Sequence, residues 1–332
     1  MKLIYLDPNS TLPKYRQIVL AIEMAIAENR LKRNDKLPSI NKVSLEFSIS
    51  RDTVLLAYDE LKKRGIIFSI LGKGYYVKSV EFSFEQRIFL LFDELNSFKE
   101  DIYNSFLETM ENKAQVDIFF HHFNMEMFQK LINESNGNYS KYIIMPTNLE
   151  GAAASIKALP KQDVYVLDQT NLALKDYPSV HQNFVKDVYD ALHKGKYLLD
   201  KYEKLILIFP GFREPLGMKT GFEKFCFDCS LNYEIIQEFT ERQIQKGEVY
   251  LIPDDRDLVE VIEQAKRQQL VLGKDFGIIS YNDIPLKKVV ENGITTISTN
   301  FKIMGETLAE MVLNSQKEQI ENPSELIIRN SL

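Results

Sequence analysis

Residues 36–77 have the sequence KLPSINKVSLEFSISRDTVLLAYDELKKRGIIFSILGKGYYV. Near its start, Ile40, Val43 and Phe47 recur at the spacing of an α-helix, so one side of a short helix over residues 39–47 is apolar and the other side is polar. The first part of the stretch therefore predicts a short amphipathic helix.

A second helix is expected after a brief interruption. Ser48–Ser50 ends the first pattern, and Ser50 can act as the N-cap of the next helix by accepting a hydrogen bond from its first turn. A new apolar stripe then runs up to Gly65, a residue typical of the position after a helix C-terminus. The stripe consists of Val54, Leu55, Tyr58 and Leu61. Two short helices joined by a tight turn predict a helix-turn-helix.

The end of the stretch predicts a β-hairpin. Residues 66–69 and 75–78 alternate like strands around Leu71–Gly74, which places Lys73 at the tip. Polar residues at the start of the second helix can reach base edges and phosphates when that helix enters the major groove of DNA. We therefore expect DNA contacts from Ser50, Arg51, Asp52 and Thr53, and a phosphate contact from Lys73.

Residues 12–78 resemble the winged-helix domain of the GntR (gluconate-repressor) family. The pieces that match its motifs, in order and in spacing, are Leu37–Ser39, Ile49–Val54, Leu61–Ile66 and Gly72–Val77. One position departs from the motif: where the family usually has a DNA-contacting arginine, this chain has Asn41, with Lys42 beside it. The resemblance implies an N-terminal winged helix-turn-helix that binds double-stranded DNA. It adds Ser39, Asn41, Lys42 and Tyr75 to the expected DNA contacts.

The charge distribution fits the same interpretation. Residues 1–80 contain 14 Lys and Arg against 8 Asp and Glu, whereas residues 81–332 contain 27 against 39. The whole chain has a net charge of −6, which hides a basic N-terminal part and an acidic remainder. A basic segment attracts the phosphate backbone, although surface lysines and arginines also serve simply to solvate helix faces.

Beyond residue 80 the pattern changes to that of an α/β protein. We expect a DNA-binding domain over residues 1–78, a linker over 79–86 and an α/β domain over 87–332. In the last of these, strand-like runs alternate with amphipathic helices, which is typical of parallel sheets. Strands are expected near 87–92, 115–120, 141–145, 163–168, 204–209, 232–236, 248–252, 276–280 and 294–298, and helices around 98–112, 124–134, 149–158, 184–194, 218–228, 256–268 and 302–314.

The region 87–332 resembles the ligand-binding domain of the lactose-repressor and galactose-repressor family, which is itself similar to periplasmic sugar-binding proteins. The matching landmarks are Ile143–Pro146, Val164–Asp168, Gly221–Phe222, Phe276–Asp283 and Ile297–Gly305. Met218 and Asn282 stand where the family has a ligand-binding arginine and an aspartate. The resemblance implies that residues 87–332 are a ligand-binding and dimerisation domain of two α/β lobes with a ligand between them. It also implies a homodimer on a palindromic operator and a monosaccharide effector such as arabinose or fucose.

In open parallel sheets, ligands bind outside the carboxyl ends of the strands. Polar residues in those loops can share the hydrogen bonds to sugar hydroxyls, and aromatic rings can pack on the apolar face of a sugar. The expected ligand-binding residues are Phe92, Phe98, Asp168, Asn183, Arg213, Lys219, Asp254 and Asn282. An aspartate after a strand often caps a helix or forms a turn, so each of these residues also has a purely structural interpretation.

The sequence gives little support to other classes of protein. Cys226 and Cys229 form a single C-x-x-C pair without a second pair or a nearby histidine, which favours structural cysteines over a metal site. The segment 211–220 departs from a phosphate-binding loop by one residue in each interval. We expect no cofactor, no metal and no enzymatic activity, and a cytoplasmic protein, because no signal peptide or membrane span is apparent. Two alternatives remain: a DNA-binding protein whose body only dimerises, and a sugar or phosphate enzyme.

Overall fold

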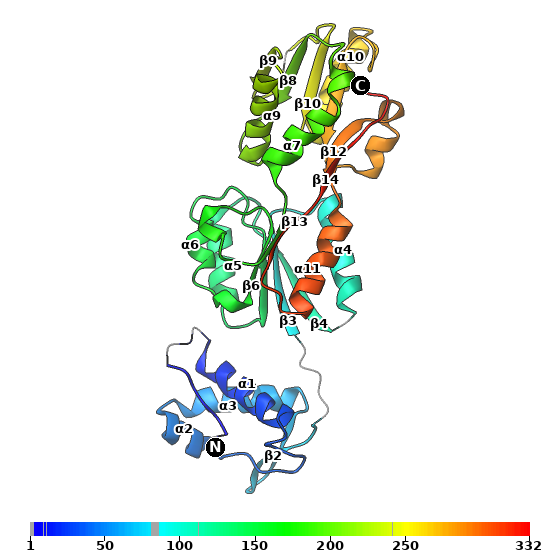
Figure 1. Cartoon of the computed structure of the whole chain (residues 1–332). Helices are drawn as coiled ribbons and strands as arrows, with labels where there is room; N and C mark the ends of the chain where they lie inside the picture. The colour runs from blue at the N-terminus through cyan, green and yellow to red at the C-terminus, as the bar shows by residue number, and fades with distance from the viewer. Residues whose placement is uncertain (1–2, 9, 11, 81–85, 112, 241) are drawn as a thin grey trace.

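The computed structural model describes residues 3–8, 10, 12–80, 86–111, 113–240 and 242–332, and it contains three bodies stacked along one axis (Figure 1). An N-terminal head lies below a first α/β lobe, and a second α/β lobe lies above it. The expected fold class, a winged helix-turn-helix followed by a two-lobed α/β domain, is confirmed. Within the described ranges, no helix is long and apolar enough to cross a membrane.

The head has the predicted helix-turn-helix and hairpin, preceded by one further helix. Its elements are α1 (Lys14–Ala27), α2 (Ile40–Phe47), α3 (Arg51–Lys63), β1 (Ile67–Ile70) and β2 (Gly74–Val77). Ser50 caps α3 by accepting a hydrogen bond from Thr53 N, and Gly65 follows its end with a φ of 70°. Both features are as predicted. The helices and the hairpin share one buried core that includes Ile18, Val54 and Leu61.

The first lobe is a six-stranded parallel sheet in the order β13-β7-β6-β5-β3-β4. Its strands are β3 (Gln86–Phe92), β4 (Ala114–Phe120), β5 (Lys141–Ile144), β6 (Val164–Asp168), β7 (Ser179–His181) and β13 (Gln319–Glu321). Its helices are α4 (Ser97–Met110), α5 (Met125–Ser135), α6 (Ala152–Ile156), α11 (Phe301–Leu313) and the 3-10 turns η1 (Lys161–Asp163) and η2 (Leu172–Leu174). One buried core lies between the sheet and α4 with α11, and another between the sheet and α5 with α6.

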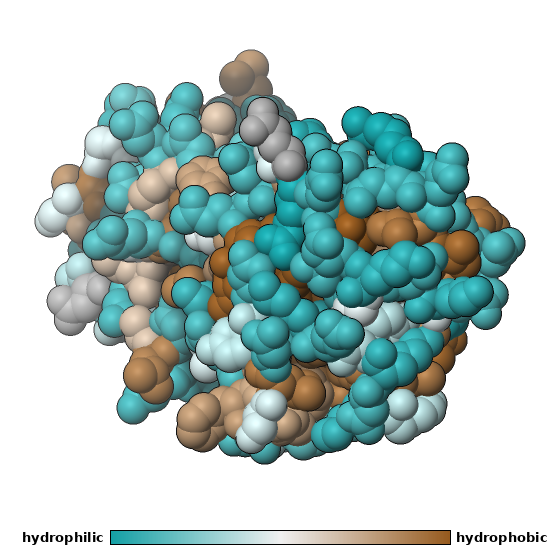
Figure 2. Space-filling view, turned by 90° about the horizontal axis from the view of Figure 1, so that it is seen from above, coloured by the Kyte–Doolittle hydropathy of each residue, from teal (hydrophilic) through white to brown (hydrophobic). Residues whose placement is uncertain are grey.

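The second lobe repeats this architecture with the order β14-β12-β11-β10-β8-β9, in which only β14 pairs antiparallel. Its strands are β8 (Lys204–Ile208), β9 (Tyr233–Ile236), β10 (Glu248–Ile252), β11 (Gly277–Tyr281), β12 (Thr295–Thr299) and β14 (Ser324–Ile327). Its helices are α7 (Phe184–Lys194), α8 (Lys196–Leu199), α9 (Leu216–Asp228), α10 (Asp255–Arg267), η3 (Pro285–Lys288) and η4 (Val290–Asn292). Seen from this end of the molecule, the surface is mainly hydrophilic with scattered apolar patches (Figure 2).

The chain passes between the lobes three times, after β7, after β12 and after β13. These crossings are tied together by the buried Asn322. Its side-chain amide donates to Thr299 Oγ1 over 2.6 Å and to Asn300 O over 3.0 Å, and its backbone N donates to His181 O over 2.7 Å. The helix α11 therefore follows a strand of the second lobe but packs in the first lobe. It lies so close to α4 that a Cβ at Gly305 would approach Ile102 O to 2.3 Å.

The expected strands and helices are present with small shifts of their ends. The expected helix over 149–158 shortens to α6, because Gly151 precedes it with a φ of 86° in the left-handed region. The short elements β7, α8, β13 and β14 were not predicted. The expected linker over 79–86 lies mostly outside the described residues, and its last residue, Gln86, already belongs to β3.

Candidate DNA-binding surface and ligand cleft

The polar N-termini of α2 and α3 lie on the surface of the head. The side chains of Asn41, Lys42, Arg51 and Asp52 are exposed, while Thr53 is half-buried. The hydroxyls of Ser39 and Ser50 are also exposed but act as N-caps: Ser39 Oγ accepts from Lys42 N over 3.2 Å and Ser50 Oγ from Thr53 N over 3.1 Å. These serines therefore fix the two helix starts that present the charged residues.

The hairpin places Lys73 at an exposed tip between two glycines with positive φ. Tyr75 has a different environment. Its half-buried ring lies edge-on to the ring of Tyr58 at 4.9 Å, and the Tyr58 hydroxyl donates to Pro38 O over 2.8 Å. Tyr75 thus joins the hairpin to α3, and through Tyr58 to the start of α2.

A cleft of about 360 Å³ lies between the two lobes. The first lobe contributes residues 93–99, 123, 168–169 and 182 to its lining, and the second lobe contributes 184, 213–215, 218, 253–256, 281–282, 284 and 287. Most of these segments follow the carboxyl ends of parallel strands, the position at which open α/β sheets bind ligands. The sequence-based prediction of the loops at these strand ends agrees with this placement.

Two buried polar pairs form the first-lobe side of the cleft. Lys99 Nζ donates to both carboxylate oxygens of Asp93 over 2.7 and 2.9 Å, and these two residues are 3% and 5% exposed. Gln182 Nε2 donates to Asp168 Oδ1 over 2.6 Å. Burial raises the pKa of the Asp168 carboxyl, although the nearby Lys99 and the hydrogen bond from Gln182 oppose the shift.

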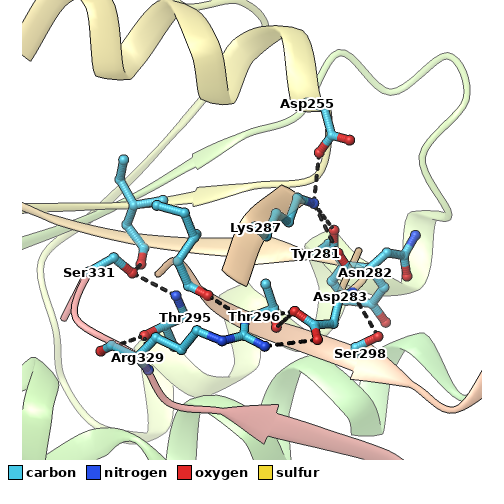
Figure 3. A network of polar contacts seen from close by, with 12 residues as sticks. Asp255, Tyr281, Asn282, Asp283, Lys287, Thr295, Thr296, Ser298, Arg329 and Ser331 are labelled. Carbon is cyan, nitrogen blue, oxygen red and sulfur yellow. Dashed lines mark hydrogen bonds and ion pairs between the residues drawn. The ribbon is translucent and has the colours of Figure 1, made fainter. Parts of the chain in front are cut away.

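On the second-lobe side, a buried lysine holds the turn after β11. Lys287 Nζ donates to Tyr281 O over 2.7 Å, to Asn282 O over 3.0 Å and to Asp255 Oδ1 over 2.7 Å (Figure 3). Burial lowers the pKa of Lys287, and Asp255 opposes that shift. Because Asn282 has a φ of 62°, an unusual value for a non-glycine residue, the lysine stabilises a backbone that would otherwise be unfavourable.

The next residue, Asp283, anchors the same turn from behind. Its carboxylate accepts two hydrogen bonds from Arg329 over 2.7 and 2.9 Å and one from Thr296 Oγ1 over 3.1 Å (Figure 3). Burial alone would raise the pKa of Asp283, but the Arg329 guanidinium holds it below the usual range. Asp283 is therefore a structural residue, and Asn282 is the one that lines the cleft.

Several buried polar atoms of the cleft lack a hydrogen-bond partner among the described residues. They are Gln182 Oε1, Asn282 Oδ1 and the Tyr281 hydroxyl. Buried polar groups are normally hydrogen-bonded, and an unpartnered one in a cleft is available to a ligand. The two amide oxygens accept hydrogen bonds, so they favour a ligand that carries hydroxyl donors.

Contacts between the lobes cross the cleft near Arg213. The Arg213 guanidinium lies 3.3 Å from the Glu94 carboxylate and 5.1 Å from the centre of the Phe123 ring, both in the first lobe. Nearby, Asn148 Nδ2 donates to Glu214 O over 2.8 Å. Arg213 and Glu94 are both substantially exposed, so this is a surface pair.

Five of the eight expected ligand-binding residues line the cleft: Phe98, Asp168, Arg213, Asp254 and Asn282. Phe98 stacks on Phe301 at 4.9 Å, and Asp254 also caps α10 through Arg256 N. The other three lie elsewhere. Phe92 is buried in the first-lobe core, Asn183 caps α7 and donates to Glu321, and Lys219 lies on α9 outside the lining.

Four further residues that line the cleft were not predicted from the sequence: Asp93, Lys99, Gln182 and Lys287. The position of Asp93 directly after a buried strand was an available signal. In the described ranges, no group of three or more His, Cys, Asp or Glu residues could hold a metal. Cys226 is a buried free thiol, and burial raises its pKa to about 12, so it stays protonated at neutral pH.

Comparisons with known protein families match both parts of the chain. Residues 14–77 match the bacterial regulatory proteins of the gntR family, and residues 234–332 match the periplasmic binding protein-like domain. The head is therefore a gntR-family helix-turn-helix domain, joined to a body of the periplasmic-binding-protein-like class. Both resemblances expected from the sequence are confirmed.

Among similar proteins, the transcriptional repressor YtrA of Bacillus subtilis is 35% identical over 75 residues, which are 23% of this chain and 58% of YtrA. This chain thus spans little more than half of that relative. The arabinose metabolism transcriptional repressor of Geobacillus stearothermophilus is 24% identical in an alignment that covers 97% of this chain and 98% of the repressor.

Solved structures share the fold of the body. A LacI family transcriptional regulator from Silicibacter pomeroyi has a TM-score of 0.63 at 12% identity and covers 74% of this chain and 98% of its own. A dimeric Lac repressor with an 11-residue C-terminal deletion has a TM-score of 0.63 at 17% identity, with the same coverage. At these identities the likeness concerns the fold alone.

Proposed function

We propose that this chain is a cytoplasmic, sequence-specific transcriptional regulator, a repressor, whose binding to an operator is controlled by a small sugar or sugar derivative. The observation that carries the proposal is the cleft between the lobes, whose buried Gln182 Oε1 and Asn282 Oδ1 lack partners among the described residues, on the same chain as a gntR-family head. The role is regulatory and involves no catalysis.

The exposed start of α3 makes the base and phosphate contacts to DNA. Arg51 and Asp52 stand at its first positions, and Asn41 and Lys42 lie near the start of α2. Lys73 at the hairpin tip contacts a phosphate. The head comprises residues 1–78, the linker residues 79–86 and the ligand-binding body residues 87–332.

For the ligand, the proposal assigns hydroxyl recognition to Asp168 and Gln182 in the first lobe and to Asn282 in the second. A ligand held from both sides favours the closed arrangement of the lobes, in proportion to its greater affinity for that arrangement. Its class is a monosaccharide such as arabinose or fucose. The similarity to an arabinose metabolism repressor supports this class.

The protein acts as a homodimer on a palindromic operator, because two half-sites bound together gain affinity from effective concentration. Closure of the lobes changes the spacing of the two heads and so changes operator affinity. Coupling of this kind is reciprocal, so operator DNA changes the affinity for the sugar by the same factor.

A thermal-shift screen against monosaccharides, disaccharides and sugar phosphates tests the proposal, because a ligand that binds the folded state raises its melting temperature. The sugar that shifts the melting temperature is then added to the protein on fluorescent operator DNA, and anisotropy reports whether affinity changes. If no sugar shifts the melting temperature while the operator is still bound, the body serves dimerisation only and the proposal fails.

A further inference from the structure

The head contacts the first lobe directly, in addition to being joined to it along the chain. The Tyr15 hydroxyl donates to Asn138 Oδ1 over 3.2 Å, and Arg16 Nη2 donates to Asn138 O over 3.0 Å. Pro13 packs against Gly137 in the same place. The start of α1 therefore docks on the turn that follows α5, which faces the head in Figure 1.

The docking turn is held in place from inside the first lobe. The hydroxyl of Tyr142, a residue with no exposed surface, donates to Ser135 O over 3.1 Å and accepts from Gly137 N over 2.8 Å. Asn138 Nδ2 donates to Glu134 O over 2.8 Å, which orients Oδ1 toward Tyr15. The turn is thus preorganised to receive the head.

Gly137 is the residue that permits the close approach. Its φ of 78° lies in the left-handed region that favours glycine, and a Cβ at this position would lie 2.2 Å from Pro13 Cδ. Any other side chain would clash with Pro13 in the docked arrangement. The position therefore has to be glycine for the contact, as well as for its own backbone.

On the head side, Arg16 links the docking turn to α3. Its Nη1 donates to Glu60 Oε1 over 2.6 Å while its Nη2 reaches Asn138 O, and the side chain is 16% exposed. Glu60 and Arg64 both lie at the C-terminal end of α3, and Arg64 pairs with the buried Glu23 of α1. Arg51, the proposed base contact, stands at the other end of the same helix.

We propose that the turn at Gly137 and Asn138 is a docking site for the head, and that this contact fixes the orientation of α3 relative to the first lobe. A movement of the first lobe then displaces the DNA-contacting end of α3 as a rigid body, rather than acting only along the chain connection. The docking itself does not depend on which ligand the cleft binds. Only its effect on operator affinity rests on the proposed function.

The first test measures the distance between head and lobe without DNA or ligand. Spin labels are attached through an unnatural amino acid at Glu28 and Lys130, whose side chains are 53% and 68% exposed. Double electron–electron resonance should give a narrow distance distribution for the parent and a broad one for Gly137→Ala. Gly151→Ala is the matched control, because Gly151 has a φ of 86° but only an ordinary 3.4 Å contact within the lobe.

A variant on the opposite side of the contact distinguishes loss of docking from local misfolding of the turn. Arg16→Gln leaves the first lobe untouched and should also broaden the distribution, because it breaks the bridge between Asn138 O and Glu60. If Gly137→Ala and Arg16→Gln both retain the narrow distribution of the parent, the docking site is refuted, while the proposed function remains standing.

The second test uses operator DNA. Loss of a preorganised orientation should weaken operator binding of ligand-free Gly137→Ala by roughly three- to tenfold. Gly151→Ala should bind the operator like the parent. If Gly137→Ala broadens the distance distribution but keeps full operator affinity, the contact does not set the orientation of α3 for DNA, and that part of the inference is overturned.

Discussion

Replacement of Asp168 by asparagine should raise the stability of the ligand-free protein and at the same time weaken ligand binding. The side chain is 6% exposed, and burial raises the pKa of its carboxyl against the opposing effects of Lys99 and Gln182. An acid with a raised pKa binds its proton more tightly in the folded than in the unfolded protein, so its ionisation lowers stability as pH rises above the ordinary aspartate range. Asp168→Asn removes this charge at nearly constant size. The ligand-free variant should therefore melt at a higher temperature than the parent at neutral pH.

The same substitution should weaken ligand binding. Asp168 Oδ1 accepts from Gln182, and the carboxylate also lines the cleft, where it can accept from ligand hydroxyls. A ligand hydroxyl left without this acceptor in the cleft costs about 1–3 kcal/mol. That cost corresponds to a roughly 5- to 150-fold increase in the dissociation constant at 25 °C. Asp168→Ala should weaken binding at least as much without the gain in stability, because it leaves Gln182 Nε2 unpartnered.

Differential scanning fluorimetry measures the first effect, and titration calorimetry with the sugar found by the screen measures the second. Asp176→Asn is the control, since its side chain in the same lobe is 68% exposed and only 3.8 Å from Lys161 in a surface pair. It should change neither quantity. Sugar binding by Asp168→Asn as tight as that of the parent would show that this carboxylate does not hold the ligand, and the placement of the site would be refuted.

Arg51→Ala should reduce the preference for operator over scrambled DNA by ~1–3 kcal/mol, whereas Lys73→Ala should weaken both alike; equal losses on both DNAs for Arg51→Ala in anisotropy would contradict its role. Burial raises the pKa of Asp187 from 3.8 to about 7, so ionisation of this carboxyl destabilises the folded protein increasingly between about pH 4 and pH 7. Asp187→Asn should therefore raise the melting temperature more at pH 8 than at pH 5. Lys287→Met leaves Tyr281 O and Asn282 O without their donor; it should lower stability by about 1–3 kcal/mol in urea and weaken sugar binding, and an unchanged urea midpoint would contradict this.

The head could be predicted closely because its signals are local. Ser50 caps α3 and Gly65 follows it with positive φ, and both roles depend only on neighbouring residues. The packing of Tyr75 could not be predicted in this way. Its place in the motif suggested the DNA face, but its ring packs on Tyr58, a contact between residues 17 positions apart that periodicity does not reveal.

In the body, some strands could be predicted from local sequence and others could not. The long strands of its sheets are continuous apolar runs, which the sequence displays directly. The strands β13 and β14 are short, polar and separated by Pro323, and β13 pairs with β7 from a distant part of the chain. Strand formation there depends on tertiary partners rather than on propensity. The chain nevertheless passes from the first lobe to the second between these two strands.

The cleft residues likewise include some that could be predicted from local sequence and some that could not. Asp168 and Asn282 could be predicted because, in each lobe, the parallel strands have their carboxyl ends at the same edge of the sheet. Phe92 and Asp93 are neighbours, yet successive residues of a strand point to opposite sides. The ring of Phe92 enters the first-lobe core, and Asp93 lines the cleft. The buried Lys99 could not be predicted, because lysines are seldom buried unless paired and its partner is known only from the fold.

The energies on the two sides of the cleft indicate what controls its closure. The contact of Arg213 with Glu94 is a substantially exposed ion pair, and such pairs contribute only about 0–1 kcal/mol. Leaving a buried acceptor unpartnered costs ~1–3 kcal/mol, and both Gln182 Oε1 and Asn282 Oδ1 are in that state among the described residues. A ligand whose hydroxyls satisfy both acceptors therefore recovers more free energy than the cross-lobe pair supplies. Under the proposed function, such a ligand therefore adds more to closure of the lobes than the pair at Arg213 does, and a difference in affinity between the open and closed arrangements is what ligand control of DNA binding requires.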